Sequence, residues 1–223
     1  MDLLEGTLDN LSTHLNYFGK GGRRIFATSS FQTQSLPLLH IISEHFPKTP
    51  ILFIDTGFLF PETYAFKDKL QKDLGLEVIS LKSEIALNQQ QDPNTGFFQY
   101  AIDPDKCCHI NKVAPLESYK KEGDVWISGV RRDQTSVRNK MELVEYSNND
   151  IIKFHPMLEW TRIDIYQYIA LHNLPKHPLE NEGYHSIGCE PCTHKITSEE
   201  NRGGRWVGSK KTECGLHFGK NEK

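Results

Sequence analysis

Residues 51–61 read ILFIDTGFLFP, and this stretch decides the fold class. It begins with Ile51–Asp55, an apolar run with the length of a buried strand. A turn follows at Asp55–Gly57, and Pro61 suits the first turn of a helix that is predicted to end at Gly75, a residue typical of helix C-termini. A buried strand joined by a turn to a helix is the unit from which parallel sheets are built.

The same alternation continues on both sides of this stretch. Further strands are predicted at Ile25–Thr28, Leu76–Leu81, Val125–Val130 and Ile151–Phe154. Further helices are predicted over residues 1–22, from about Leu36 to Phe46, and from a capping box of Thr161 and Asp164 through His172. Residues 88–105 and 175–223 are predicted to be irregular. We therefore predict the α/β class, with an open, mainly parallel sheet flanked by helices. One domain would span residues 1–223, beginning with the helical segment 1–22 and ending in a mobile tail from about 198 to 223.

The composition is ordinary for a globular protein, with 37% hydrophobic and 25% charged residues. The formal net charge of −3 argues against a general nucleic-acid or membrane-surface binder, although local arginines still suit a small anionic ligand. The start of the chain, MDLLEGTLDN, lacks the features of a signal peptide, and no apolar stretch is long enough to cross a bilayer. We expect a cytoplasmic protein, in which structural disulfides are rare.

Ligands of open parallel sheets sit beyond the carboxyl ends of the strands. Three polar segments are predicted there: Ser29–Ser35, Asp55–Gly57 and Gly129–Arg138. The hydroxyls of the first segment precede a helix and suit an anion, but it lacks the lysine of a Walker A loop, and an ordinary N-cap at Ser35 is the alternative. Arg131 and Arg132 suit phosphate or sulfate, the alternative being a solvated loop in which Asp133 pairs with one arginine.

The chain has five cysteines: Cys107, Cys108, Cys189, Cys192 and Cys214. Four metal ligands plus one reactive thiol explain an odd number better than a disulfide framework does. An adjacent pair and a CxxC suit a cluster with separate iron atoms better than a single zinc ion, although a redox dithiol and merely buried thiols are alternatives. Lys210, Lys211 and His217 favour a thiolate at Cys214, which is otherwise an incidental surface cysteine.

Eight segments carry a resemblance to a known family. They are, in order, TSSFQTQSLPLLH, IDTGFLFPETYAF, CCHINKVAPL, ISGVRRDQTSVR, PMLEWTRIDIYQYI, LPKHPLENEGYHSIGCEPCT, RGGRW and KTECGLH. Together they resemble the sulfonucleotide reductases, which act on adenylyl sulfate or phosphoadenylyl sulfate, and they cover roughly residues 24–218. The resemblance implies a fold like that of the adenine-nucleotide α-hydrolases, also called the PP-loop fold.

The resemblance also implies site residues. A [4Fe–4S] cluster would be ligated by Cys107, Cys108, Cys189 and Cys192, and the nucleophile would be Cys214. Substrate-binding residues would be Ser29, Ser30, Gln34, Ser35, Asp55, Thr56, Gly57, Lys112, Gly129, Arg131, Arg132, Arg138, Arg202, Arg205 and His217. The family loop usually has glycine where this chain has Gln32, and because glycine permits positive φ, the geometry of this loop is a point for the structure to decide.

The implied activity is thiol-dependent reduction of adenylyl sulfate to sulfite and AMP through an S-sulfocysteine, in sulfate assimilation and cysteine biosynthesis. Thioredoxin or glutaredoxin would supply the electrons, since no second redox cysteine lies next to Cys214. Phosphoadenylyl-sulfate or dual-substrate reduction is the first alternative. A PP-loop ATP pyrophosphatase and a non-catalytic metal sensor are more distant ones. A homo-oligomer is left open.

Overall fold

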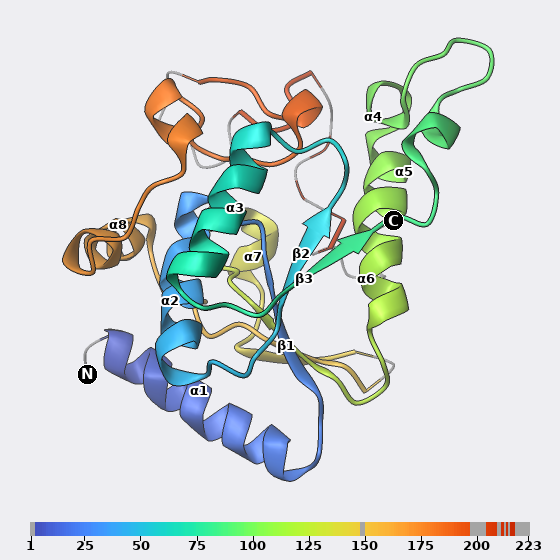
Figure 1. The fold of residues 1–223 in the computed structure, drawn as a ribbon. Coiled ribbons are helices and arrows are strands. Elements are labelled where there is room, and N and C mark those ends of the chain that lie inside the picture. Colours follow the sequence, from blue (N-terminus) through green and yellow to red (C-terminus); the bar gives the residue numbers. More distant parts are fainter. Residues whose placement is uncertain are drawn as a thin grey trace. The chain divides into compact units, whose positions relative to one another are not determined.

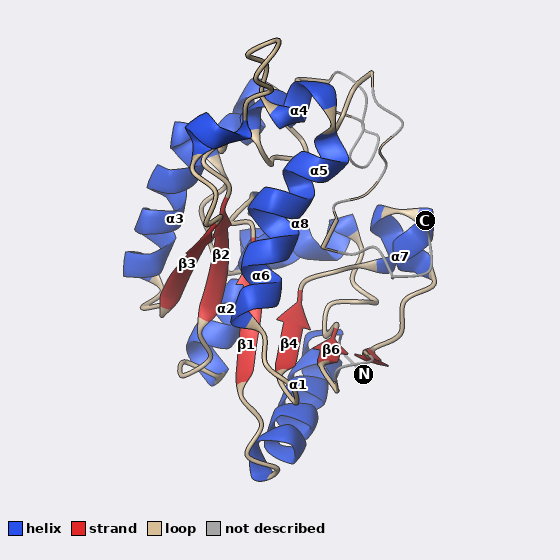
Figure 2. Ribbon diagram, turned by 90° about the vertical axis from the view of Figure 1, so that its right-hand side faces the viewer, coloured by secondary structure: helices blue, strands red, loops and turns tan. Residues whose placement is uncertain are grey.

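The computed structural model describes residues 3–147, 150–196, 204–208, 211, 213 and 215–216. Its strands form one six-stranded sheet in the order β3-β2-β1-β4-β6-β5 (Figure 2). Their bounds are β1 Ile25–Ser29, β2 Ile51–Asp55, β3 Val78–Lys82, β4 Val125–Ser128, β5 Val144–Tyr146 and β6 Ile152–Phe154. Strand β1 is parallel to β2 and β4, and β6 is parallel to β4, whereas β5 runs antiparallel to β6. The predicted class, a mainly parallel sheet flanked by helices, is confirmed.

The helices alternate with these strands along the chain (Figure 1). The α-helices are α1 Leu3–Lys20, α2 Leu36–His45, α3 Pro61–Asp73, α4 Gln99–Ile102, α5 Pro104–Cys108, α6 Ala114–Tyr119, α7 Ser136–Asn139 and α8 Arg162–Leu171. The 3₁₀ turns are η1 Thr33–Ser35, η2 Leu87–Gln90, η4 Arg132–Gln134, η5 Pro178–Glu182 and η6 Glu190–Cys192, and a π-helical turn, η3, spans His109–Val113. Within the described ranges, no helix is both long and apolar enough to cross a membrane.

Most predicted elements are present, with differences at their ends that have physical causes. The third strand begins at Val78 and not at Leu76, because the Leu76 N–H bonds to the carbonyl of Gln71 and closes the C-terminus of α3 beyond Gly75. The capping box of Thr161 and Asp164 is confirmed at the start of α8. The prediction that residues 88–105 are irregular was wrong for part of the range, since η2 ends there, α4 lies there and α5 begins there.

The chain folds into two compact units. Unit 1 comprises residues 1–53, 65–79 and 121–177, and unit 2 comprises residues 54–64, 80–120 and 178–223. Unit 1 is built on β1 and β4, where Phe26 and Ile127 are fully buried. Helix α1 packs on this core, and the ring of His14 stacks on Phe154 of β6 at 4.8 Å. Unit 2 carries α4, α5 and α6 and all four described cysteines, and it has its own small apolar cluster at residues 60, 179 and 187.

Candidate active site

The loop after β1, in unit 1, turns at Phe31. This residue has a φ of 54°, an uncommon conformation for a bulky side chain, and its buried ring lies edge-on to Phe53 at 5.6 Å. Its N–H donates to Ser29 Oγ over 3.0 Å. Gln32 has a φ of −78°, which any residue adopts. The chain therefore needs no glycine at position 32, because the positive φ falls on the buried Phe31.

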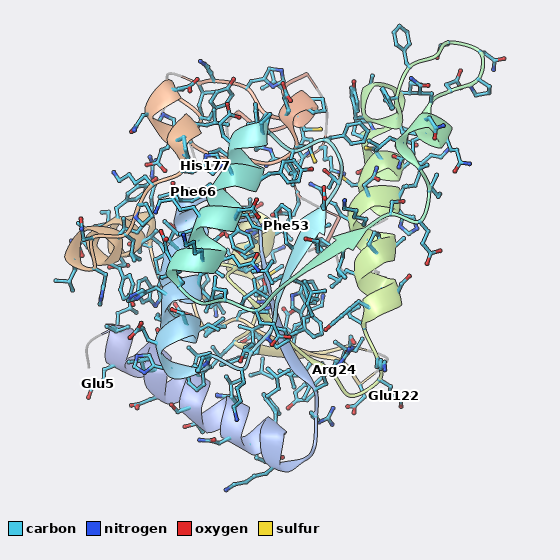
Figure 3. All side chains as sticks on the ribbon, in the orientation of Figure 1. Glu5, Arg24, Phe53, Phe66, Glu122 and His177 are labelled. Atoms are coloured by element: carbon cyan, nitrogen blue, oxygen red, sulfur yellow. The ribbon has the colours of Figure 1, made fainter. Side chains whose placement is uncertain are left out.

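The serine hydroxyls of this loop do not cap the following helix. Ser35 occupies the N-cap position of α2 but makes no capping hydrogen bond, and its Oγ lies 3.4 Å from Ser30 Oγ. The loop is held from behind by Thr33, whose Oγ1 accepts the N–H of the fully buried His177 over 3.0 Å. His177 packs in turn on Phe66, with ring centroids 5.1 Å apart (Figure 3). Ser35 is therefore the N-cap residue of α2, as the alternative predicted, but its hydroxyl does not make the expected capping hydrogen bond.

Arg131 joins the loop after β4 to the loop after β1. Its side chain is 1% exposed, and its guanidinium donates to Gln34 Oε1 over 2.9 Å and to Asp133 Oδ1 over 3.0 Å. Burial lowers the pKa of Arg131, and the carboxylate of Asp133 opposes that change. Asp133 also accepts the N–H of Arg162, at the start of α8, over 2.8 Å. The alternative prediction that Asp133 pairs with one arginine is confirmed, but that arginine, Arg131, is buried, so the loop is not a solvated one.

The other arginines of this loop have different surroundings. Arg132 donates to Glu159 over 2.8 Å and to the carbonyl oxygens of Asn139 and Met141 over 2.7 and 2.6 Å. Arg138 is buried and donates to the side chain of Gln134. Gly129 allows close packing, since a Cβ there would lie 3.3 Å from Cδ2 of a leucine in α2. Arg131 therefore lies beside Gln34 and interacts with Arg138, whereas Arg132 is engaged by groups that the sequence did not indicate as part of the site.

In unit 2, the turn after β2 supports the CxxC segment. A hydrogen bond of 3.3 Å joins Thr56 Oγ1 to the sulfur of Cys189. Thr56 Oγ1 also accepts the N–H of Phe58 over 3.2 Å, and the Phe58 carbonyl accepts the N–H of Glu190 over 2.7 Å. These bonds tie both the side chain and the backbone at the start of the CxxC to the end of a strand.

Asp55 fixes the shape of this turn. Its carboxylate accepts the Tyr64 hydroxyl over 2.6 Å and the N–H of Gly57 over 3.1 Å, and it pairs with Lys82 at 3.2 Å. Burial pushes the pKa of Asp55 upward, but these hydrogen bonds outweigh it, so the pKa lies below its ordinary value. Burial and the neighbouring Asp55 raise the pKa of Tyr64. Asp55 is therefore a charged anchor of the turn.

The adjacent cysteines end helix α5. Asp103 caps this helix by accepting the N–H groups of Asp105 and Lys106 over 3.1 and 3.0 Å. Cys107 and Cys108 are 8% and 6% exposed, and successive helix residues point about 100° apart. Burial and, to a smaller extent, the other three described cysteines raise the pKa of Cys107 to about 12, although a hydrogen bond from an asparagine opposes the rise. The other three described sulfurs therefore lie within electrostatic reach of Cys107.

Two of the predicted cationic residues lie near Cys192. Burial and then Cys189 raise its pKa, whereas the charges of Lys112 and Arg205 lower it. The guanidinium of Arg205 occupies the space that a side chain at Gly188 would take, and its Nε donates to the Cys192 carbonyl over 3.2 Å. The two segments are also joined by an isolated antiparallel bridge between residues 193 and 205. Positive charge is thus concentrated beside the CxxC.

The described C-terminal residues contact the helix that carries the cysteine pair. Lys211 is 3% exposed and forms an ion pair with Asp105. A Cβ at Gly215 would lie 3.1 Å from Val113 Cγ2 and 3.8 Å from Cys108 Cβ. The predicted residues Arg202, Cys214 and His217, and most of the tail predicted from about 198, lie outside the described residues.

The four described cysteines form no disulfide. In the part of the chain that the structure describes, no three histidine, cysteine, aspartate or glutamate side chains are arranged to hold one metal ion. Sequence reasoning missed Gln90 and Asn111, which form hydrogen bonds with each other; Asn111 also bonds to Cys107. The four-residue spacing from Cys107 to Asn111 was an available signal for one of them, but Gln90 carries none.

Comparison with known proteins finds relatives that match most of the chain. The family model described as "Phosphoadenosine phosphosulfate reductase domain" matches residues 24–195. A protein of Rhodococcus opacus named adenosine 5'-phosphosulfate reductase is 36% identical over 201 residues, which are 89% of this chain and 81% of the relative. A protein of Gloeobacter violaceus named phosphoadenosine 5'-phosphosulfate reductase is 37% identical over 203 residues, 88% of this chain and 83% of the relative.

Solved structures with low sequence identity share the fold. The phosphoadenylyl-sulfate reductase of Candida auris superposes with a TM-score of 0.63 at 22% identity, covering 82% of this chain and 94% of that one. The FMN adenylyltransferase of Candida glabrata superposes with a TM-score of 0.61 at 15% identity, covering 86% of this chain and 64% of that one. The architecture is therefore shared with at least two kinds of nucleotide-handling enzyme.

Proposed function

Because the chain belongs to the phosphoadenosine phosphosulfate reductase domain family, we propose that it reduces adenylyl sulfate to sulfite and AMP for sulfate assimilation. The supporting observation is that one compact unit gathers Cys107, Cys108, Cys189 and Cys192, with Lys112 and Arg205 beside the last of them. This is the donor set and the charge that the family resemblance implies. The free thiols are consistent with a reaction in the cytoplasm.

The four cysteines are proposed to hold a [4Fe–4S] cluster. The donor set has the chemistry of such a group, since it consists of four free thiols in one compact unit, of which three are buried and of which Cys107 interacts electrostatically with the other three. Cys107 and Cys108 occupy consecutive helix positions, so their sulfurs suit separate iron atoms better than one ion. When bound, the cluster would supply a structural and electrostatic centre, and Thr56 would hold the Cys189 ligand in place.

The proposed chemistry begins at Cys214. Its thiolate attacks the sulfur of the sulfuryl group, an S–S bond forms, the bond from sulfur to the phosphate oxygen breaks, and AMP leaves with the electron pair. The product is an S-sulfocysteine. One thiol of a protein dithiol, such as thioredoxin or glutaredoxin, then attacks the Cys214 sulfur and releases sulfite, and its second thiol resolves the mixed disulfide. The donor is thereby oxidised by two electrons, and the Cys214 thiol is restored.

Residues outside the cysteines would bind and orient the nucleotide. In unit 1, the loop hydroxyls of Ser30 and Ser35 suit phosphate, and Arg131, paired with Asp133, would hold Gln34 at that loop. In unit 2, Lys112 and Arg205 would offset charge on the sulfuryl group. Arg202 and His217 are proposed to assist them.

The choice of adenylyl sulfate rests on the complete set of four ligand cysteines, which by resemblance accompanies that substrate. Curated relatives are named for both nucleotides, as the Rhodococcus and Gloeobacter proteins illustrate. Reduction of phosphoadenylyl sulfate is therefore the second candidate.

Intact mass spectrometry of the anaerobically purified protein tests the proposal. The protein is incubated with either nucleotide in the absence of a thiol donor, and Cys214→Ser is the matched control. We expect addition of one SO₃ group from adenylyl sulfate, none in the control, and release of the adduct as sulfite when reduced thioredoxin is added. An adduct formed only from phosphoadenylyl sulfate would reverse the substrate assignment. No adduct from either nucleotide would refute the reductase proposal.

A further inference from the structure

Two buried amide side chains of unit 2 hold each other. Gln90 is 2% exposed and Asn111 is 1% exposed. Gln90 Nε2 donates to Asn111 Oδ1 over 2.9 Å, and Asn111 Nδ2 donates to Gln90 Oε1 over 2.6 Å. Gln90 Nε2 also donates to the carbonyl of Ile85 over 2.9 Å. A reciprocal pair of amides would also form if both were flipped, but a backbone carbonyl only accepts, so the bond to Ile85 fixes which atom of the Gln90 amide is the nitrogen, and the pair then orients Asn111.

The second N–H of Asn111 is thereby directed at Cys107. Asn111 Nδ2 lies 3.2 Å from the carbonyl oxygen of Cys107 and 3.7 Å from its sulfur. Both contacts lie within hydrogen-bonding distance, the longer one because sulfur is a large acceptor. Asn111 approaches this cysteine from the next turn of the helix, at a separation of four residues.

The backbone at this point departs from an ordinary α-helix. The turn η3, His109–Val113, has π-helical hydrogen bonding and lies between α5 and α6. In Figure 1, α5 and α6 follow one another along a single column. Single π-turns inside helices are rare and occur frequently at functional sites. Here the π-turn contains the residue whose amide faces the adjacent cysteine pair.

We infer that Asn111 is a positioning residue for the ligand Cys107 and that Gln90 keeps its N–H directed at the sulfur, an inference that rests on the proposed iron–sulfur cluster. An N–H donor stabilises negative charge on a ligand sulfur. It therefore favours the reduced cluster and raises the midpoint potential. It also helps to retain the cluster, because it orients the sulfur and stabilises its thiolate form.

The alternative is that the amide pair only stabilises the fold, and a set of four variants separates the two roles. Asn111→Leu removes the donor at similar volume and leaves the Gln90 amide without its partner. Gln90→Leu keeps the donor and removes its clamp. The double variant replaces both amides by apolar groups, so no buried amide lacks its partner and much of the stability should return. Thr7→Val is the matched control, because it removes a buried hydroxyl of unit 1 that accepts the N–H of Trp160 Nε1 over 2.8 Å and donates to the Leu3 carbonyl over 2.9 Å.

Three quantities are measured anaerobically on cluster-bearing protein: the midpoint potential, the rate of cluster loss to a chelator, and the temperature of unfolding. Asn111→Leu should lower the potential and speed cluster loss by about 10- to 100-fold. Gln90→Leu should change both in the same direction by less. The double variant should unfold at a higher temperature than Asn111→Leu, yet keep the lowered potential and the faster loss. Thr7→Val should change the unfolding temperature alone.

Two results would overturn the inference and leave the proposed function intact, provided that the wild-type protein still forms its SO₃ adduct. One is a normal potential and normal cluster retention in Asn111→Leu. The other is their full recovery in the double variant, since that pattern belongs to a purely structural pair. A wild-type protein that takes up no iron and sulfide would overturn both this inference and the proposed cluster.

Discussion

Replacement of Gly57 by alanine should destabilise the turn that supports the CxxC segment, for two reasons with separate magnitudes. Gly57 has a φ of 73°, and an alanine in this left-handed region costs roughly 1–2 kcal/mol. In addition, a Cβ at this position would lie 2.9 and 3.0 Å from the two terminal carbons of Leu87. Leu87 is 39% exposed and is able to rotate away, at a cost of about 0.5–1.5 kcal/mol for an unfavourable rotamer.

The structure provides a control that isolates the first term. Gly75 has a φ of 62°, and a Cβ there would meet nothing within 4 Å. Gly75→Ala should therefore cost roughly 1–2 kcal/mol, and Gly57→Ala should cost about 0.5–1.5 kcal/mol more. In a Leu87→Ala background, Gly57→Ala should lose this additional cost.

The free energies of unfolding are measured by urea denaturation under reducing conditions for the four variants and the wild type. Equal costs for the two glycine replacements, or an unchanged cost of Gly57→Ala in the Leu87→Ala background, would refute the steric part of the reasoning. An insignificant cost for both replacements would refute the conformational part.

Asp133→Asn should lower the free energy of unfolding by about 1–3 kcal/mol, because it removes the charge that pairs with the buried Arg131 guanidinium. Arg131→Met removes that guanidinium, so the double variant, measured by urea denaturation, should lose less free energy of unfolding than the sum of the losses of the two single variants. His40→Gln should make stability less dependent on pH, because burial and then His172 lower the pKa of His40 from 6.5. Folding therefore favours the neutral ring, and the wild type loses stability as the pH falls below that value. Thermal unfolding across about pH 5–8 measures the difference, and parallel curves would contradict this reading. Asp105→Asn should speed amide hydrogen exchange in residues 204–208 by up to about fivefold, since an ion pair with a largely exposed carboxylate contributes at most about 1 kcal/mol. Combining Asp105→Lys with Lys211→Asp reverses both charges and restores an ion pair, so exchange in this double variant should be slower than in Asp105→Lys alone. Equally fast exchange in these two variants would argue against the ion pair.

The sequence contains much of the fold in local signals. The run ILFID, the proline at position 61 and the glycine at position 75 place β2 and α3 correctly, because strand length, proline geometry and left-handed glycine are properties of single residues and their neighbours. The antiparallel β5 could not be predicted in the same way. It is three residues long and depends on pairing with β6.

In the candidate site, too, features that depend on nearby residues were predictable and those that depend on distant residues were not. Cys107, Cys108, Cys189 and Cys192 are predicted as ligands by their residue type and spacing; the structure places them in one compact unit, where the other three interact electrostatically with Cys107. The surroundings of Arg131 were not predictable, because its partner Gln34 lies 97 residues earlier in the chain. The positive φ at Phe31 was equally hidden, since it depends on burial of that ring and not on a glycine.

Unit 2 is discontinuous in the sequence, and this has a consequence for how the protein is made. Cys108 leaves the ribosome 81 residues before Cys189 (189 − 108), and a translation rate of about 5–20 residues per second makes this interval about 4–16 s. During that time the nascent chain contains the Cys107–Cys108 pair without the CxxC segment that is proposed to complete the ligand set. The proposed cluster therefore cannot acquire its full set of ligands until Cys189 and Cys192 have been synthesised, which is late in the translation of this sequence.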